Sequence, residues 1–105
     1  MSLEDAKRLV GYAAIDNHVT RNGMKVGIGS GSTIVYSIER LGEKIKKGSL
    51  KSIRTVCTSF QSTLLCKQHG IPVTTLDDPE INGELDVAID GADEFEPNGL
   101  HLIKG

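Results

Sequence analysis

Apolar positions change their spacing partway along residues 24–41, from a continuous run to the repeat of a helix. Lys25–Ile28 is a short, mostly apolar run, which is typical of a buried strand. Glycine and hydroxyl residues follow at positions 29–33. Beyond them, apolar residues recur at helical intervals on one face: Ile34, Ile38, Leu41 and Ile45. The pattern therefore predicts a strand, a tight loop and a helix that lies on a sheet.

The rest of the chain predicts further strands and helices in alternation. Ser2 and Asp5 resemble a capping box at the start of a helix over residues 3–19, and Gly70 ends a helix that begins near Phe60. The other expected strands span residues 53–58, 73–76, 85–89 and 100–103. Such alternation implies right-handed crossovers. We expect an α/β fold, with an open, mostly parallel, Rossmann-like sheet and helices on both faces, incomplete at the C-terminus and without an internal domain boundary in residues 1–105.

The loop between the first strand and its helix suits a phosphate ester. Its glycines let the backbone turn and approach a ligand, its serine and threonine hydroxyls donate, and a helix N-terminus attracts anions. Neither common nucleotide motif is met. Counting from Gly27, the sixth position of the dinucleotide fingerprint is Ser32, not glycine, and no lysine precedes Ser32 or Thr33 as in nucleotide hydrolases. A turn that only connects strand and helix remains the alternative.

Composition narrows the function classes. The chain has 105 residues, 38% of them hydrophobic, and a formal charge of −2, with Lys and Arg scattered. This balance favours a folded protein and does not indicate binding to nucleic acid or to an anionic membrane. No apolar stretch approaches a membrane span, so we expect a cytoplasmic location. Cys57 and Cys66 are expected to be buried free thiols, and none of the three histidines is assigned to a metal.

A second chemical group follows the expected strand 85–89. Asp90 and Asp93 flank Gly91, and carboxyl ends of parallel strands share one edge, so we expect these carboxylates near the 29–33 loop. Lys104, directly after the strand expected at 100–103, could balance their charge and stabilise an oxyanion. An acidic solvated turn and a surface lysine are the alternatives.

Three segments of this chain occur in a specific order: GIGSGST at 27–33, AIDGADE at 88–94 and LIKG at 102–105. Together they resemble the N-terminal part of ribose-5-phosphate isomerase A, and the similarity extends over nearly the whole chain, including TSFQ at 58–61. The resemblance implies interconversion of ribose 5-phosphate and ribulose 5-phosphate, in the pentose phosphate pathway, without a metal or an organic cofactor.

The resemblance also implies roles for individual residues. Asp90 and Asp93, with Gly91 and Ala92 between them, would meet the sugar hydroxyls, and Asp90 would assist ring opening. Lys104 would stabilise the enediolate formed when a proton leaves C2. The phosphate end of the substrate would be held by a loop of four residues: Ser30, Gly31, Ser32 and Thr33.

The family's general-base glutamate follows a run of glycines after this lysine, and the sequence of 105 residues does not reach it. We therefore expect a truncated piece of the isomerase, inactive alone, whose full-length form is a homo-oligomer. A non-catalytic, phosphosugar-binding regulatory module is the alternative. A nucleotide-dependent oxidoreductase would have an acidic residue at the end of the second strand, where this chain has Thr58 and Ser59.

Overall fold

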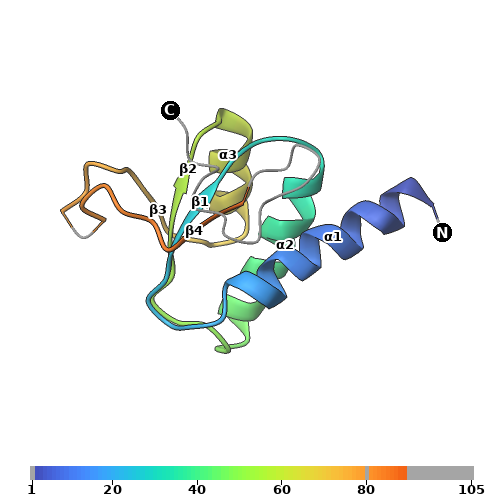
Figure 1. Cartoon of the computed structure of the whole chain (residues 1–105), viewed down its shortest axis with the longest axis horizontal. Helices are drawn as coiled ribbons and strands as arrows, with labels where there is room; N and C mark the ends of the chain where they lie inside the picture. Colours follow the sequence, from blue (N-terminus) through green and yellow to red (C-terminus); the bar gives the residue numbers. More distant parts are fainter. Residues whose placement is uncertain (1, 80, 90–105) are drawn as a thin grey trace.

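A computed structural model describes residues 2–79 and 81–89, in which the strands form one parallel sheet (Figure 1). The order across the sheet is β3-β2-β1-β4, and every neighbouring pair is parallel. The strands are β1 (Lys25–Ile28), β2 (Arg54–Cys57), β3 (Val73–Thr74) and β4 (Val87–Ile89). The helices are α1 (Leu3–His18), α2 (Thr33–Lys46) and α3 (Phe60–Gln68). The predicted α/β fold with a parallel sheet is confirmed.

Most predicted elements are found, and the strands differ mainly at their ends. β1 has its predicted bounds, whereas β2 is one residue shorter at each end. β3 stops at Thr74, whose hydroxyl donates to the Asp78 carboxylate and so turns the chain early. β4 begins two residues late, because Asp86 bonds to Lys25 through both its backbone N–H and its carboxylate. The strand predicted at residues 100–103 lies outside the described residues.

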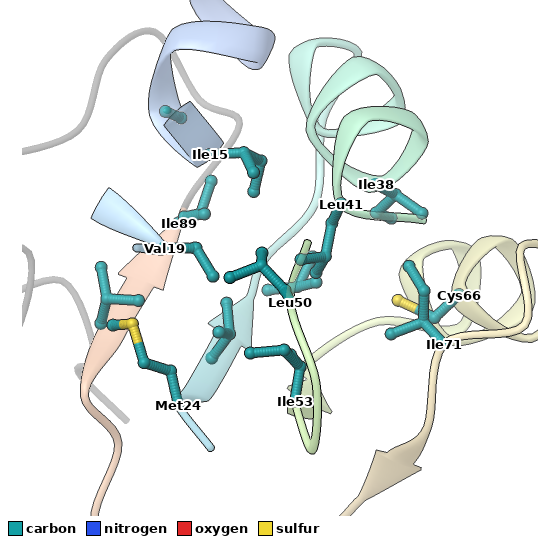
Figure 2. Close-up of a cluster of buried hydrophobic side chains, with 14 of the residues drawn as sticks. Ile15, Val19, Met24, Ile38, Leu41, Leu50, Ile53, Cys66, Ile71 and Ile89 are labelled. Atoms are coloured by element: carbon teal, nitrogen blue, oxygen red, sulfur yellow. The ribbon is translucent and has the colours of Figure 1, made fainter. Parts of the chain in front are cut away.

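All three helices share one hydrophobic core with one face of the sheet. Val26 and Ile28 in β1 point to the same side as Val87 and Ile89 in β4, because side chains alternate along a strand. Figure 2 shows side chains from the helices, including Ile15, Ile38 and Cys66, gathered in this cluster. The predicted apolar face of α2 is confirmed, with three members fully buried and Ile45 packed at the edge: Ile34, Ile38, Leu41 and Ile45.

On the opposite face of the sheet, the Leu85 side chain approaches the backbone closely at Gly27. A Cβ added there would lie 2.8 Å from Leu85 Cδ1, and the register partners Val56 and Ala88 are buried. The β3–β4 connection thus covers part of this face. A helix on this second face stays a prediction. No described helix combines the length and apolar composition that a membrane-spanning segment requires.

Candidate functional site

The order of the strands creates a switch point between β1 and β4. From β1 the chain moves through β2 to β3 on one side, then returns to place β4 on the other side (Figure 1). Ile28 and Ile89 are register partners at the carboxyl ends, and the Gly29 N–H donates to the Ile89 carbonyl at 2.8 Å. In open parallel sheets, ligands bind at such a point. The 29–33 loop therefore begins beside the end of β4, whereas the carboxylates expected near it, Asp90 and Asp93, lie outside the described residues.

The loop from Gly29 to α2 presents polar groups to solvent. Ser30 and Ser32 are exposed, and Gly31 and Thr33 are partly exposed. Gly31 has φ +116°, a conformation that glycine adopts without the penalty other residues incur. Within the described residues, the hydroxyls of Ser30, Ser32 and Thr33 make no hydrogen bond. The loop therefore offers hydroxyl donors that residues 2–79 and 81–89 do not use.

The N-terminus of α2 is favourable for an anion. Ser32 is the N-cap, but its backbone is already helical (φ −74°, ψ −30°) and its side chain makes no capping hydrogen bond. The first backbone N–H groups of a helix have no partner within the helix, and they carry a partial positive charge. No acidic residue lies in the first turn of α2, whereas Lys44 and Lys46 lie in its last turn. The lysines complement the negative C-terminal end, whereas the first turn offers no carboxylate to the positive end.

The neighbouring β2–α3 turn is tied to the end of β1. The Thr58 N–H donates to the Ile28 carbonyl at 3.0 Å, and the Thr58 hydroxyl reaches the same oxygen at 3.3 Å. Ser59, the N-cap of α3, accepts from the Ser62 N–H at 3.1 Å. The two strand-to-helix turns therefore share one edge of the sheet.

Helix α1 fixes the N-terminal half of α2 through a close contact that the sequence analysis missed. The Ser37 hydroxyl donates to the Gly11 carbonyl at 3.0 Å, and a Cβ on Gly11 would lie 2.7 Å from Tyr36 Cβ. The available signal was a glycine inside a helix, which costs about 1 kcal/mol relative to alanine and so suggests a packing requirement.

Ion pairs join the C-terminal part of α1 to the second half of α2. The Asp16 carboxylate accepts from Arg40 Nε at 2.9 Å and lies 3.0 Å from Lys44 Nζ. Hydrogen bonding to Arg40, together with Lys44, holds the pKa of Asp16 below its ordinary value. Tyr12 of α1 donates to Glu39 of α2 at 2.5 Å. Helix α2 is thus held against α1 along much of its length.

The two cysteines are free, as predicted, and their sulfur atoms lie 3.6 Å apart. Cys66 is fully buried, but Cys57 is partly exposed, so its predicted full burial is wrong. Cys57 is the last residue of β2 and therefore opens toward the edge of the sheet. The hydrogen bond between the two thiols, together with nearby hydroxyl groups, lowers the pKa of the Cys57 thiol.

The described residues do not include every candidate. Asp90, Gly91, Ala92, Asp93 and Lys104 lie outside them, so their predicted roles stay predictions. Residues 2–79 and 81–89 contain no group of three side chains arranged to hold a metal ion.

A separate groove of about 350 Å³ lies between α2 and the end of α3. Its lining mixes charges of both signs: Glu39, Gly42, Glu43, Lys46, Gln68 and His69. Because the lining residues of α2 lie in the middle and at the end of that helix, the groove is separate from the loop at its N-terminus.

Comparison with known proteins adds independent evidence. The family described as ribose 5-phosphate isomerase A (phosphoriboisomerase A) matches residues 54–105. Ribose-5-phosphate isomerase A of Trichodesmium erythraeum (strain IMS101) is 50% identical over 99 residues, covering 94% of this chain and 39% of the relative.

Solved structures agree with the sequence relatives. Ribose 5-phosphate isomerase from Plasmodium falciparum has a TM-score of 0.79 at 36% identity, covering 89% of this chain and 38% of that one. A D-ribose-5-phosphate isomerase in complex with phospho-erythronic acid has a TM-score of 0.80 at 40% identity, covering 94% and 41%. The chain spans about two fifths of the length of these relatives. The sequence motifs, the parallel sheet and these similarities together establish that the chain belongs to the ribose-5-phosphate isomerase A family.

Proposed function

We propose that this protein takes part in the interconversion of ribose 5-phosphate and ribulose 5-phosphate. The observation that carries the proposal is the N-terminus of α2, which lies at the β1/β4 switch point and whose Ser32 makes no capping hydrogen bond within the part of the chain that the structure describes. A phosphate group is the anion that such a helix end and its glycine loop accommodate best.

The phosphate end of the substrate would bind at the β1–α2 loop. Backbone N–H groups near Gly31 and the hydroxyls of Ser30, Ser32 and Thr33 would donate to the phosphate oxygens. One relative is named as a complex with phospho-erythronic acid, a phosphorylated acid, which supports a site of this kind in the family. The absence of an acidic residue in the first turn of α2 avoids repulsion of that charge.

The sugar end would meet the residues that follow β4 in the sequence. Asp90 comes directly after Ile89, the register partner of Ile28, and Asp93 follows three residues later. In the proposed reaction Asp90 assists ring opening, and the Lys104 ammonium stabilises the enediolate after a proton leaves C2. The proposal includes a cytoplasmic location, expected because the sequence has no apolar stretch long enough to span a membrane, and assembly of the full-length form into a homo-oligomer, which follows from the resemblance.

Binding and turnover should be measured separately on the purified protein. Titration calorimetry should show that ribose 5-phosphate binds at least about tenfold more tightly than ribose, because most of the affinity comes from the phosphate. NAD serves as a matched control, since the turn after β2 has no acidic residue to hold its ribose. Equal affinity for ribose and its phosphate would overturn the proposed phosphate site.

Turnover distinguishes an isomerase from a binding module. Proton exchange at C2 of ribose 5-phosphate in deuterated water, followed by NMR, reports the enediolate directly. Exchange together with formation of ribulose 5-phosphate supports the proposal. Tight binding without either would contradict the catalytic part and favour the non-catalytic regulatory module.

A further inference from the structure

Two thiols meet beside the proposed substrate loop, and the proposed reaction does not use them. Cys57 ends β2 and Cys66 lies on α3, nine positions later, with 3.6 Å between their sulfur atoms. Cys66 is fully buried in the core, while Cys57 is partly exposed. Cys57 is thus the more accessible residue of the pair, and Cys66 is shielded from solvent.

We propose that Cys57 and Cys66 form an oxidisable thiol pair, in which a peroxide oxidises Cys57 and Cys66 then closes an intramolecular disulfide. This inference is independent of the proposed isomerase activity, because it rests on the two sulfur atoms and their surroundings. In reducing compartments, disulfides that form are usually transient and often redox-sensing, which fits a pair that is free in this structure.

The surroundings of the two sulfur atoms make their reactivities unequal. The groups that face Cys57 are Cys66, Ser62 and Thr63 from α3 and Thr55 from its own strand. These polar neighbours, Cys66 most of all, favour the thiolate and lower the pKa of Cys57. The hydrogen bond to Cys57 and burial raise the pKa of Cys66, which therefore stays protonated. Since the thiolate is the nucleophile, Cys57 reacts first.

The oxidation balances with hydrogen peroxide as the oxidant. The Cys57 thiolate attacks one peroxide oxygen, the O–O bond breaks, and a sulfenic acid and hydroxide form. Cys66 then loses its proton as its sulfur attacks the Cys57 sulfur and displaces the sulfenic oxygen. Overall, two thiols and one hydrogen peroxide give one disulfide and two water molecules.

Closing the disulfide requires a small movement at the edge of the sheet. The sulfur atoms must approach from 3.6 Å to about 2.05 Å. The loop that would be closed contains Thr58, whose N–H is bonded to the end of β1, and Ser59, which caps α3. Oxidation would therefore act on the turn beside the β1–α2 loop.

Mass spectrometry of one tryptic peptide tests the pair directly. Cleavage after Arg54 and Lys67 gives a peptide that contains both cysteines and no internal Lys or Arg. The native protein is treated with stoichiometric hydrogen peroxide, then alkylated in denaturant and digested. We expect the peptide to be two hydrogen atoms lighter than the dithiol and free of alkyl groups. Dithiothreitol should return it to the doubly alkylated form.

Matched serine variants assign the order of the two steps. In Cys66→Ser, oxidation should stop at a sulfenic acid on Cys57 that dimedone captures. In Cys57→Ser, the remaining thiol should react at least about tenfold more slowly with peroxide. A wild-type peptide that remains doubly alkylated, or a disulfide between two protein molecules, would overturn the proposal even if both variants failed to fold.

Discussion

The two strand-to-helix turns lie side by side at the edge of the sheet, but the N-termini of their helices are capped differently. In the β2–α3 turn, Ser59 is extended (φ −136°, ψ 159°) and its hydroxyl accepts from the Ser62 N–H. In the β1–α2 turn, Ser32 is already helical and caps nothing with its side chain. The Ser59 carbonyl also accepts from the Thr63 hydroxyl at 2.9 Å. The N-terminus of α3 is capped by its own serine, whereas among the described residues no side chain caps the N-terminus of α2.

This difference separates a structural turn from a binding turn. Serine is common at helix N-caps, so the sequence at each position looks equally suited to capping. Only the backbone conformation shows which hydroxyl is committed. The open helix end has a stability cost, which the contacts of α1 along α2 offset, whereas α3 caps itself. The predictions below test this division of roles.

The largest difference in substrate affinity between the two turns is expected when a negative charge is placed at the N-cap of each helix. Ser32→Asp puts a carboxylate where the phosphate is proposed to bind, and we expect the affinity for ribose 5-phosphate to fall by about a hundredfold or more. Stability should stay within about 1 kcal/mol of wild type, because aspartate is a good N-cap. Titration calorimetry and urea unfolding measure the two effects.

Ser59→Asp is the matched control in the neighbouring turn. It introduces the same charge at the N-cap of α3, where the wild-type serine already performs the capping. We expect affinity to fall less than about threefold. Equal losses in both variants would mean that the two turns do not differ in function.

A methyl group at Gly11 should weaken the support of the open helix end. The added Cβ would lie 2.7 Å from Tyr36 Cβ and 3.0 Å from the Ser37 backbone nitrogen, so α1 and α2 must separate. We expect Gly11→Ala to lower the free energy of unfolding by about 1–3 kcal/mol, although alanine favours helix. Gly48→Ala is a poor control because of its positive φ, so Arg21→Ala on the exposed turn after α1 serves instead. An unchanged unfolding midpoint for Gly11→Ala would contradict the contact.

Smaller effects are expected when each N-cap hydroxyl is removed. One variant should lose stability, and the other should lose affinity for the substrate. Ser59→Ala loses the hydrogen bond to the Ser62 N–H, and we expect the free energy of unfolding to fall by about 1 kcal/mol. Ser32→Ala loses no such bond, so we expect a change below about 0.5 kcal/mol in stability but a weaker affinity for ribose 5-phosphate. Urea titrations of both variants, with calorimetry on the second, decide between the two roles.

The sequence pattern predicted the fold well where the burial of apolar side chains decides the structure. The spacing of Ile34, Ile38 and Leu41 required a helix with one buried face, and those residues are fully buried. Strand ends were less predictable, because side-chain bonds set them. The Thr74 hydroxyl donates to the Asp78 carboxylate and ends β3 early. The two residues meet only once the turn between them has formed.

Features that depend on contacts between distant segments were the ones missed. The approach of α1 at Gly11 to Tyr36 and the meeting of Cys57 with Cys66 both need the tertiary fold. Similarly, the sequence places Ser32 and Ser59 in equivalent positions, and only the structure shows that one hydroxyl is uncommitted.

The smallest expected effect concerns the ion pairs that join α1 to α2, and it depends on pH. Arg40 and Lys44 lower the pKa of Asp16, so the charged carboxylate stabilises the folded state at neutral pH. That contribution is present above the ordinary pKa of about 3.9 and is lost as the pH falls through the lower folded-state value. Because Asp16 is 37% exposed, solvent screening limits it to below about 1 kcal/mol. Urea unfolding should therefore show Asp16→Asn less stable than wild type near pH 7, with the difference disappearing toward about pH 3, whereas Asp77→Asn on an exposed turn should show none at neutral pH. A difference for Asp16→Asn that persists in acid would mean that the charge of the carboxylate does not account for the contribution of Asp16 to the contact between α1 and α2.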